Sequence, residues 1–138
     1  MIYFPYDTSP WGEVQQCRPI CAGVYTVSTA GHGGIMALRE VAERIFTKEA
    51  QECGVWEGGY LCFEEDCDAA VAIRELLDKG LMRAPVNEHY KEGECEEIID
   101  RVVQQWNPEY WVARSEWMKA EQKTEGFKNK NNDSREER

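Results

Sequence analysis

The sequence predicts an α+β fold: a small antiparallel sheet packed by three to four helices, with a helical C-terminal third. Two observations lead to this prediction. Short segments rich in Val, Tyr and Thr, typical of strands, lie in the first half of the chain. Apolar residues follow helical spacing through most of the second half. With 138 residues, 42% of them hydrophobic, the chain is long enough for one compact domain, which we place at residues 1–121.

The predicted strands lie before residue 64. A first strand covers residues 13–17 and is ended by Arg18 and Pro19, because proline cannot donate to a sheet ladder. A second strand covers residues 23–29 and forms a loose hairpin with the first. Residues 55–63 are expected to form a further strand, with Gly58 and Gly59 as a turn or bulge within it.

Helical spacing begins after Gly34 and predicts a helix that includes Leu38 and ends near Gly54. A second helix is expected to begin around Asp66 and to end at Gly80, a residue typical of C-terminal caps.

A third helix is expected over residues 94–106. Asn107 and Pro108 then mark the start of a last helix, because Asn is a good N-cap and Pro suits the first helical position. Residues 122–138 are polar and charged, which predicts a flexible tail.

Charge excludes several partners. The chain carries a formal net charge of −10, and its last 20 residues contain six basic and five acidic residues, so the preceding 118 carry −11. Such a body is repelled by nucleic acid and by anionic membranes, so we expect neither as a direct partner, whereas a basic protein surface would attract it. No export signal or membrane-spanning run is recognised, and the six cysteines lack disulfide or zinc spacing, which predicts a cytoplasmic protein with reduced thiols and no metal.

A glycine-rich loop is the main candidate for a binding site. Residues 27–34 read Val-Ser-Thr-Ala-Gly-His-Gly-Gly, so a ligand could approach the main chain closely. The hydroxyls of Ser28 and Thr29, the imidazole of His32 and the amides of Gly33 and Gly34 could then hold a phosphate or ribose. The alternative is that these glycines only make a tight strand-to-helix turn.

An acidic segment, Glu64-Glu65-Asp66-Cys67-Asp68, follows about thirty residues later. Its carboxylates could simply complement the N-terminus of the next helix. Alternatively, Glu65 and Asp66 turn toward the His32 loop and bind the same ligand, with Trp11 stacking on a base. A small hydrolase using His32 with Asp66 or Cys67 is a further alternative.

A second acidic run lies in the predicted third helix and just before it. Such a run is usually a solvated face, but it could also imitate phosphates to a basic protein. Its candidate partner-binding residues are Glu92, Glu94, Glu96, Glu97 and Asp100.

In this order, the Trp11–Gly12 turn, the loop at residues 27–34 and the acidic Glu-Asp-Cys segment resemble an uncharacterised domain family of bacteriophages, plasmids and other mobile elements. The resemblance covers residues 9–77. The family has no known activity, so it implies no catalytic residue and no cofactor. It implies an accessory protein that acts in the bacterial cytoplasm, where small acidic proteins of this setting often counter host defences.

We therefore expect a non-enzymatic binding protein that counters a bacterial defence system, with sequestration of a small polar or nucleotide-derived molecule as its route. The first alternative is an acidic nucleic-acid mimic that inhibits a basic defence effector such as a CRISPR nuclease. A homo-oligomer is compatible with either. The leading hypothesis requires residues 28–34 and 64–67 to close around one site.

Overall fold

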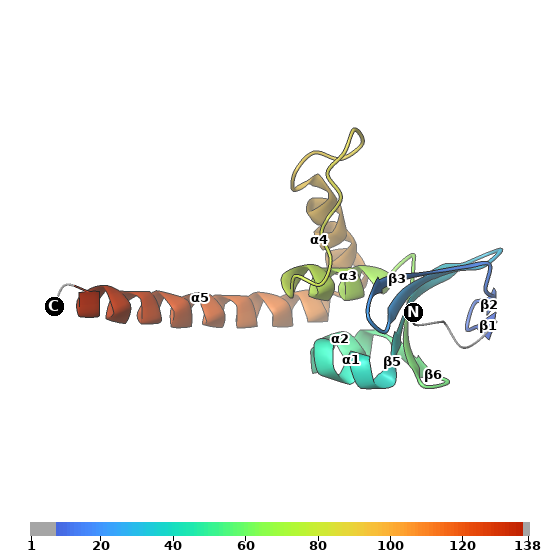
Figure 1. Cartoon of the computed structure of the whole chain (residues 1–138), viewed down its shortest axis with the longest axis horizontal. Coiled ribbons are helices and arrows are strands. Elements are labelled where there is room, and N and C mark those ends of the chain that lie inside the picture. Colours follow the sequence, from blue (N-terminus) through green and yellow to red (C-terminus); the bar gives the residue numbers. More distant parts are fainter. Residues whose placement is uncertain (1–7, 137–138) are drawn as a thin grey trace.

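A computed structural model describes the backbone of residues 8–136 and the side chains of residues 9–122. Its centre is a five-stranded antiparallel sheet in the order β3-β4-β5-β7-β6 (Figure 1). These strands are β3 (Gln16–Cys21), β4 (Val24–Ser28), β5 (Gly33–Leu38), β6 (Val55–Glu57) and β7 (Tyr60–Glu64). A separate small hairpin pairs β1 (Thr8–Ser9) with β2 (Gly12–Glu13).

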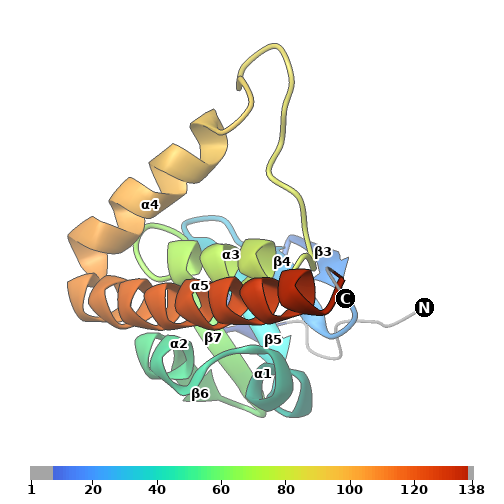
Figure 2. The ribbon, with the colours of Figure 1, turned by 90° about the vertical axis from the view of Figure 1, so that its left-hand side faces the viewer.

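Five helices complete the α+β fold and confirm the predicted class. They are α1 (Arg39–Ile45), α2 (Lys48–Cys53), α3 (Ala69–Asp78), α4 (Glu94–Trp106) and α5 (Pro108–Glu136). The first three lie beside one face of the sheet, whereas α4 leans away from it and α5 extends well beyond the body (Figures 1 and 2). Within the described chain, no helix is both long and apolar enough to cross a membrane.

The two faces of the sheet carry separate hydrophobic clusters. The larger cluster packs Ile35, Leu61 and Phe63 against the helices, including Val71 and Leu76 of α3. The smaller cluster lies on the other face, where Trp11 and Val14 pack against buried side chains. Those buried side chains are Tyr25, Val27, Met36, Tyr60 and Cys62.

The largest departure from the predicted elements is β5, a central strand where the sequence predicts a loop and the start of a helix. All its residues from Gly33 to Ala37 are buried. A strand buried on both faces has no polar alternation, and a short apolar run of this kind cannot be distinguished from a helix by its spacing. The glycine-rich segment therefore joins two strands instead of a strand and a helix.

The predicted helix that was to end near Gly54 is two helices. Phe46 has an extended backbone, with ψ of 139°, and separates α1 from α2. Thr47 then caps α2, since its hydroxyl accepts a hydrogen bond from the Ala50 N–H at 3.2 Å. The Phe46 ring packs edge-on against Phe63, with centroids 5.3 Å apart. Burial of this ring in the core accounts for the break.

The N-terminal strands also differ from the prediction. Pro19 lies inside β3 instead of ending a strand, and the register shifts between Pro19 and Cys21. Proline is tolerated here because β3 is an edge strand, where a missing N–H leaves no ladder partner unpaired. The single strand expected over residues 55–63 is two strands, β6 and β7, and the expected turn at Gly58 and Gly59 joins them. The end of α3 before Gly80, the bounds of α4 and the start of α5 are confirmed.

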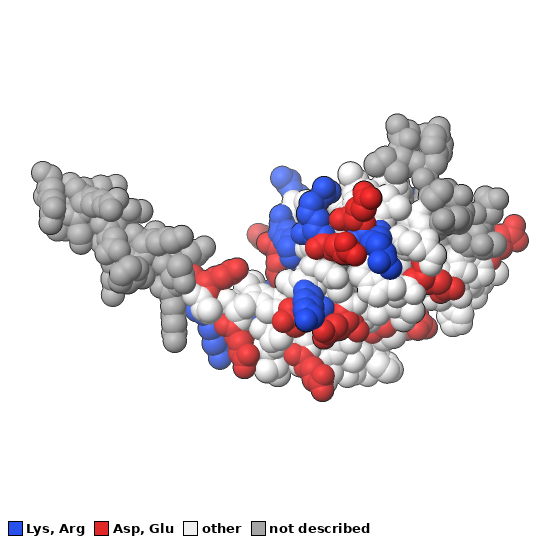
Figure 3. Space-filling view, turned by 90° about the horizontal axis from the view of Figure 1, so that it is seen from below, with Lys and Arg blue, Asp and Glu red and all other residues white. Residues whose placement is uncertain are grey.

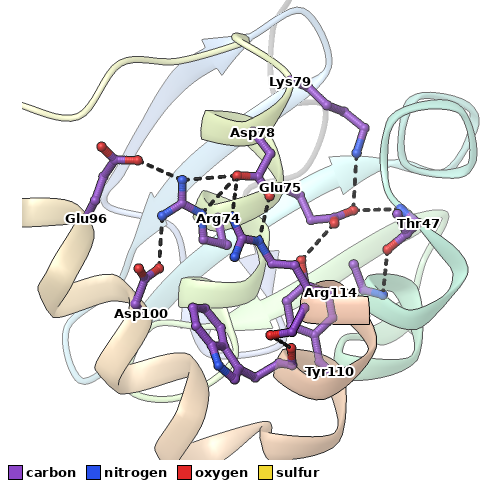
Figure 4. Close-up of polar contacts among 12 residues, drawn as sticks. Thr47, Arg74, Glu75, Asp78, Lys79, Glu96, Asp100, Tyr110 and Arg114 are labelled. Carbon is purple, nitrogen blue, oxygen red and sulfur yellow. Dashed lines mark hydrogen bonds and ion pairs between the residues drawn. The ribbon is translucent and has the colours of Figure 1, made fainter. Parts of the chain in front are cut away.

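Arg74, a buried arginine of α3, fastens α4 to the body. Its guanidinium donates to Glu96 at 2.7 Å and to Asp100 at 2.9 Å, both on α4 (Figure 4). It also pairs with Asp78, one turn along α3, at 3.1 Å. Only 6% of Arg74 is exposed, so the three carboxylates replace the water that its charge loses on folding.

A second buried group, Glu75, joins α5 and α2 to α3. Its carboxylate accepts from the Tyr110 hydroxyl at 2.8 Å and from the Thr47 N–H at 2.7 Å (Figure 4). Arg114 of α5 donates two hydrogen bonds to Asp78, at 2.8 and 2.9 Å. These side chains form what we call the buried ionic network: Arg74, Glu75, Asp78, Glu96, Asp100, Tyr110 and Arg114.

The backbone of α5 remains helical to Glu136, beyond residue 121, where we place the end of the compact domain. The flexibility of residues 122–138 stays a prediction. At the start of α5, the Asn107 side-chain amide donates to Asp68 at 3.2 Å, which ties the α4–α5 corner to the segment before α3.

Candidate functional site

The two segments that carry the sequence motifs lie side by side at one end of the sheet. Gly34 at the start of β5 pairs with Glu64 at the end of β7. One residue further, the Glu65 N–H donates to the Gly33 carbonyl at 3.0 Å. Because β5 and β7 are antiparallel neighbours, the turn that precedes β5 and the segment that follows β7 lie at the same end of the sheet.

His32 ends a four-residue hairpin turn between β4 and β5, and Thr29 holds that turn closed. The Thr29 N–H donates to the His32 carbonyl at 2.8 Å. The Thr29 hydroxyl accepts from the His32 N–H at 3.1 Å and lies 2.6 Å from the His32 carbonyl oxygen and 3.2 Å from that of Trp11. The hydroxyl thus positions the His32 backbone, while the His32 residue itself is exposed.

His32 forms a cluster with the two acidic residues that the sequence places in the same site. One ligand atom from each of His32, Glu65 and Asp66 lies within 4.8 Å of the other two, and all three residues are exposed. An imidazole nitrogen with two carboxylate oxygens is a donor set that divalent transition ions accept. Donor atoms bound to one ion lie roughly 3 to 4 Å apart, so rotations of these exposed side chains would close the set.

The acidic residues of this cluster are not needed to cap α3. That helix begins at Ala69, later than predicted, and has no acidic residue in its first turn. The Asp68 side chain at the N-cap makes no capping hydrogen bond. Among the described residues, neither Glu65 nor Asp66 forms an ion pair with Lys or Arg. Helix capping therefore does not account for these two carboxylates.

Gly33 and Gly34 are residues of β5, and close neighbours explain why both are glycine. A Cβ at Gly34 would clash with the Phe63 carbonyl and would lie 2.7 Å from the Trp11 ring. A Cβ at Gly33 would lie 2.5 Å from the Val27 carbonyl oxygen. The predicted contact of these two residues with a ligand stays a prediction.

Trp11 and Ser28 flank the cluster. The Trp11 ring lies against Gly34 and packs on the smaller hydrophobic cluster, so part of its surface is already used by the fold. Ser28 is exposed at the end of β4, opposite Gly33. Stacking of Trp11 on a base stays a prediction.

Cys67 is poorly suited to act as the nucleophile of a hydrolase. Burial raises the pKa of its thiol, and the charge of Asp68 raises it further. Its sulfur lies 3.9 Å from a carboxylate oxygen of Glu64. Since the thiolate is the nucleophilic form, these surroundings oppose covalent catalysis by Cys67 at neutral pH.

The acidic residues at positions 92–100 fall into two groups: some form contacts within the fold, and others are exposed. Glu96 and Asp100 are engaged by Arg74, and the Glu94 carboxylate accepts from the Lys91 N–H at 3.2 Å. Glu92 and Glu97 are exposed. Part of the predicted partner-binding surface therefore holds the helices together.

Sequence reasoning missed the buried ionic network altogether. Its one visible signal is that Arg74 and Glu75 lie between the apolar residues Ile73 and Leu76, in a helix of only ten residues. Charged residues are rarely buried unless they are paired, so this pattern becomes informative once α3 is known to contact α2, α4 and α5.

The fold and the site together define a small α+β protein with an exposed histidine–carboxylate cluster at one end of its sheet. The chain belongs to the family of a domain of unknown function (DUF7007), whose family model matches residues 5–137. The prediction of an uncharacterised domain family is confirmed, and the match includes α4 and α5, beyond the range of the motif resemblance. No curated protein and no solved structure matches the chain.

Proposed function

We propose that this is a binding protein in which His32, Glu65 and Asp66 hold a divalent metal ion, and that the ion binds a nucleotide-like ligand. The observation that carries the proposal is the convergence of these three donors within 4.8 Å from segments about thirty residues apart in the sequence. The sequence predicts the convergence of these residues but no metal; the distances between their donor atoms indicate one.

Electrostatics favours a metal as the link to an anionic ligand. The chain has a net charge of −10, and two carboxylates in the cluster would repel a free phosphate. A bound divalent ion reverses the local sign of the charge. Three protein donors also leave coordination positions open for phosphate oxygens, as in sites where Mg²⁺ or a similar ion bridges protein and nucleotide.

The biological role that we propose is sequestration of a nucleotide-derived signal by a phage or mobile-element protein, which would blunt a bacterial defence. Support for this setting comes from the resemblance carried by the Trp11–Gly12 turn, the His32 loop and the acidic Glu-Asp-Cys segment. The exposed position of the cluster supports binding of a ligand from solution.

Calorimetric titration of the full chain with Mn²⁺ or Zn²⁺ tests the metal site. One ion per chain is expected, with affinity lowered on the order of tenfold or more in His32→Ala and Asp66→Asn. His89→Ala is the matched control, because His89 is also exposed and lies 3.6 Å from the carboxylate of Glu88. Equal losses in His89→Ala and His32→Ala would contradict the assignment.

A second titration, with ADP as the probe, tests the ligand. Binding is expected with metal present and is expected to disappear with a chelator or in Asp66→Asn. After heat denaturation the nucleotide should be recovered intact. Recovery of hydrolysed nucleotide would instead favour the hydrolase alternative, and metal-independent ADP binding would contradict the bridging role of the ion.

A further inference from the structure

A cavity of about 620 Å³ lies where α4 ends and α5 begins, beside α2. Figure 2 shows these three elements meeting at one side of the body. The side chains that matter for its chemistry are Glu49, Glu52 and Cys53 from α2 and Trp106, Glu109 and Tyr110 from the α4–α5 corner. A cavity of this volume is within the range of small-molecule sites.

The charge of this cavity has one sign. Glu49, Glu52 and Glu109 line it, all three are exposed, and no Lys or Arg is among its described lining residues. Within the described chain, none of the three forms an ion pair. In the view from below, the Lys and Arg side chains gather mainly in one group, while Asp and Glu side chains are spread over the face (Figure 3).

The thiol of Cys53, which lines the cavity, lies near the same carboxylates. Burial raises the pKa of Cys53 to about 11, and the charges of nearby carboxylates, among them Glu52 and Glu109, contribute to the increase. With three lining carboxylates and no lining Lys or Arg among the described residues, the cavity is a place where a positive charge would be stabilised.

Trp106 adds a flat aromatic surface that the fold leaves uncovered. Its exposed fraction is 55%. The protein covers two other indoles with its own cations: Arg39 lies 5.0 Å from the ring centroid of Trp56, and Arg114 lies 5.2 Å from that of Trp111. Indole is the strongest aromatic acceptor of a cation, and among the described residues none lies over Trp106.

We infer that this cavity binds an organic cation, a guanidinium or alkylammonium group, between the Trp106 ring and the carboxylates of Glu49, Glu52 and Glu109. The group can belong to a free small molecule or to an Arg side chain of a basic partner protein. The site is distinct from the His32 cluster and requires neither a metal nor a nucleotide.

Titration of the full chain with arginine amide, spermidine and a short Arg-rich peptide tests this site. Binding is expected for at least one probe and should weaken with added salt. Trp106→Ala and the isosteric Glu52→Gln/Glu109→Gln pair should each lower affinity by about tenfold. Binding of the small probes identifies a metabolite site, and binding of the peptide alone identifies a partner side chain.

Three controls separate this site from diffuse attraction. Trp56→Ala removes an indole outside the cavity, and Glu92→Gln/Glu97→Gln removes the same charge from α4 and the segment just before it. His32→Ala removes a ligand of the proposed metal site. If this variant binds the organic cation as tightly as the wild-type chain does, the cavity at Trp106 acts independently of the metal site. The inference is overturned if no probe binds, or if Glu92→Gln/Glu97→Gln lowers affinity as much as Glu52→Gln/Glu109→Gln does.

Discussion

The buried ionic network and the His32 cluster use the same kinds of side chain in opposite ways. In the network, each carboxylate faces an Arg, Tyr or backbone donor, and Arg74 and Glu75 are almost fully buried. In the cluster, Glu65 and Asp66 are exposed and lie together without a Lys or Arg partner among the described residues.

This difference distinguishes carboxylates that stabilise the fold from carboxylates that are available to bind a ligand. Breaking a buried charge pair leaves the remaining charge without water or partner, which is strongly destabilising. Two exposed like charges held close together repel each other and contribute little to stability. The pairing of β5 with β7 brings His32 beside these two adjacent carboxylates, and we propose a metal ligand for the three side chains because no Lys or Arg of the described residues pairs with Glu65 or Asp66.

The largest effect is expected from Arg74→Ala, which leaves Glu96 and Asp100 without their cation, while Asp78 keeps Arg114. We expect the free energy of unfolding to fall by about 3–5 kcal/mol, measured by urea denaturation. Arg39→Ala is the matched control, because Arg39 is exposed and forms a weak ion pair with Glu43 at 4.0 Å. This variant should lower the free energy of unfolding by less than about 1 kcal/mol. Similar losses for the two variants would contradict the distinction between buried and exposed pairs.

A smaller loss is expected from Gly34→Ala, which tests the packing under the cluster. The added methyl group would clash with the Phe63 carbonyl and the Trp11 ring, at an expected cost of about 1–3 kcal/mol. Gly31→Ala is the control in the adjacent β4–β5 turn, since its Cβ would meet nothing within 4 Å. If both variants unfold at the same urea concentration, Gly34 is not held by these contacts.

High pH should lower the free energy of unfolding through two buried groups, the Cys53 thiol and the Tyr110 hydroxyl. Burial raises the pKa of Cys53 to about 11, and burial together with the Glu75 charge raises the pKa of the Tyr110 hydroxyl. Because these folded-state values lie above the unfolded ones, the stability they contribute is present below pH 9 and is lost as the pH rises toward 11.

Urea unfolding at pH 8 and pH 10.5 measures this loss. Cys53→Ser removes one titrating group while keeping a donor for the Glu49 carbonyl, which the Cys53 thiol contacts at 3.4 Å. The variant should therefore lose less stability than the wild-type chain over this interval. A larger loss in the variant would contradict the assigned role of Cys53.

The smallest effect on stability is expected from Glu65→Gln and Asp66→Asn. Each removes one of two neighbouring like charges, so the free energy of unfolding should change by less than about 0.5 kcal/mol or rise slightly. The same variants are expected to lose metal binding. A large destabilisation, measured by the same urea titration, would assign these residues to the fold.

Elements with local signals could be predicted from the sequence. The turn at Gly58 and Gly59 and the helix α4 ending before Pro108 follow from turn residues and helical spacing, and both are confirmed. The convergence of the His32 loop with Glu65 and Asp66 was also expected, although the sequence suggested a loop before a helix where β5 lies.

The rest depends on contacts that no local pattern encodes. The strand β5 is buried on both faces, so it lacks the alternation by which strands are recognised. The partners of Arg74 lie 22 and 26 residues away on α4, and the cavity at Trp106 forms only where α2 meets the α4–α5 corner. These features require the fold itself.

The most direct test of the metal site is a ¹⁵N NMR titration of the full chain with Mn²⁺ below one equivalent. Paramagnetic broadening should appear first at the amides of residues 31–33 and 64–67 and should be absent from those amides in Asp66→Asn. Broadening that begins at residues 92–97, or that spreads evenly over the acidic surface, would contradict a metal site at His32, Glu65 and Asp66.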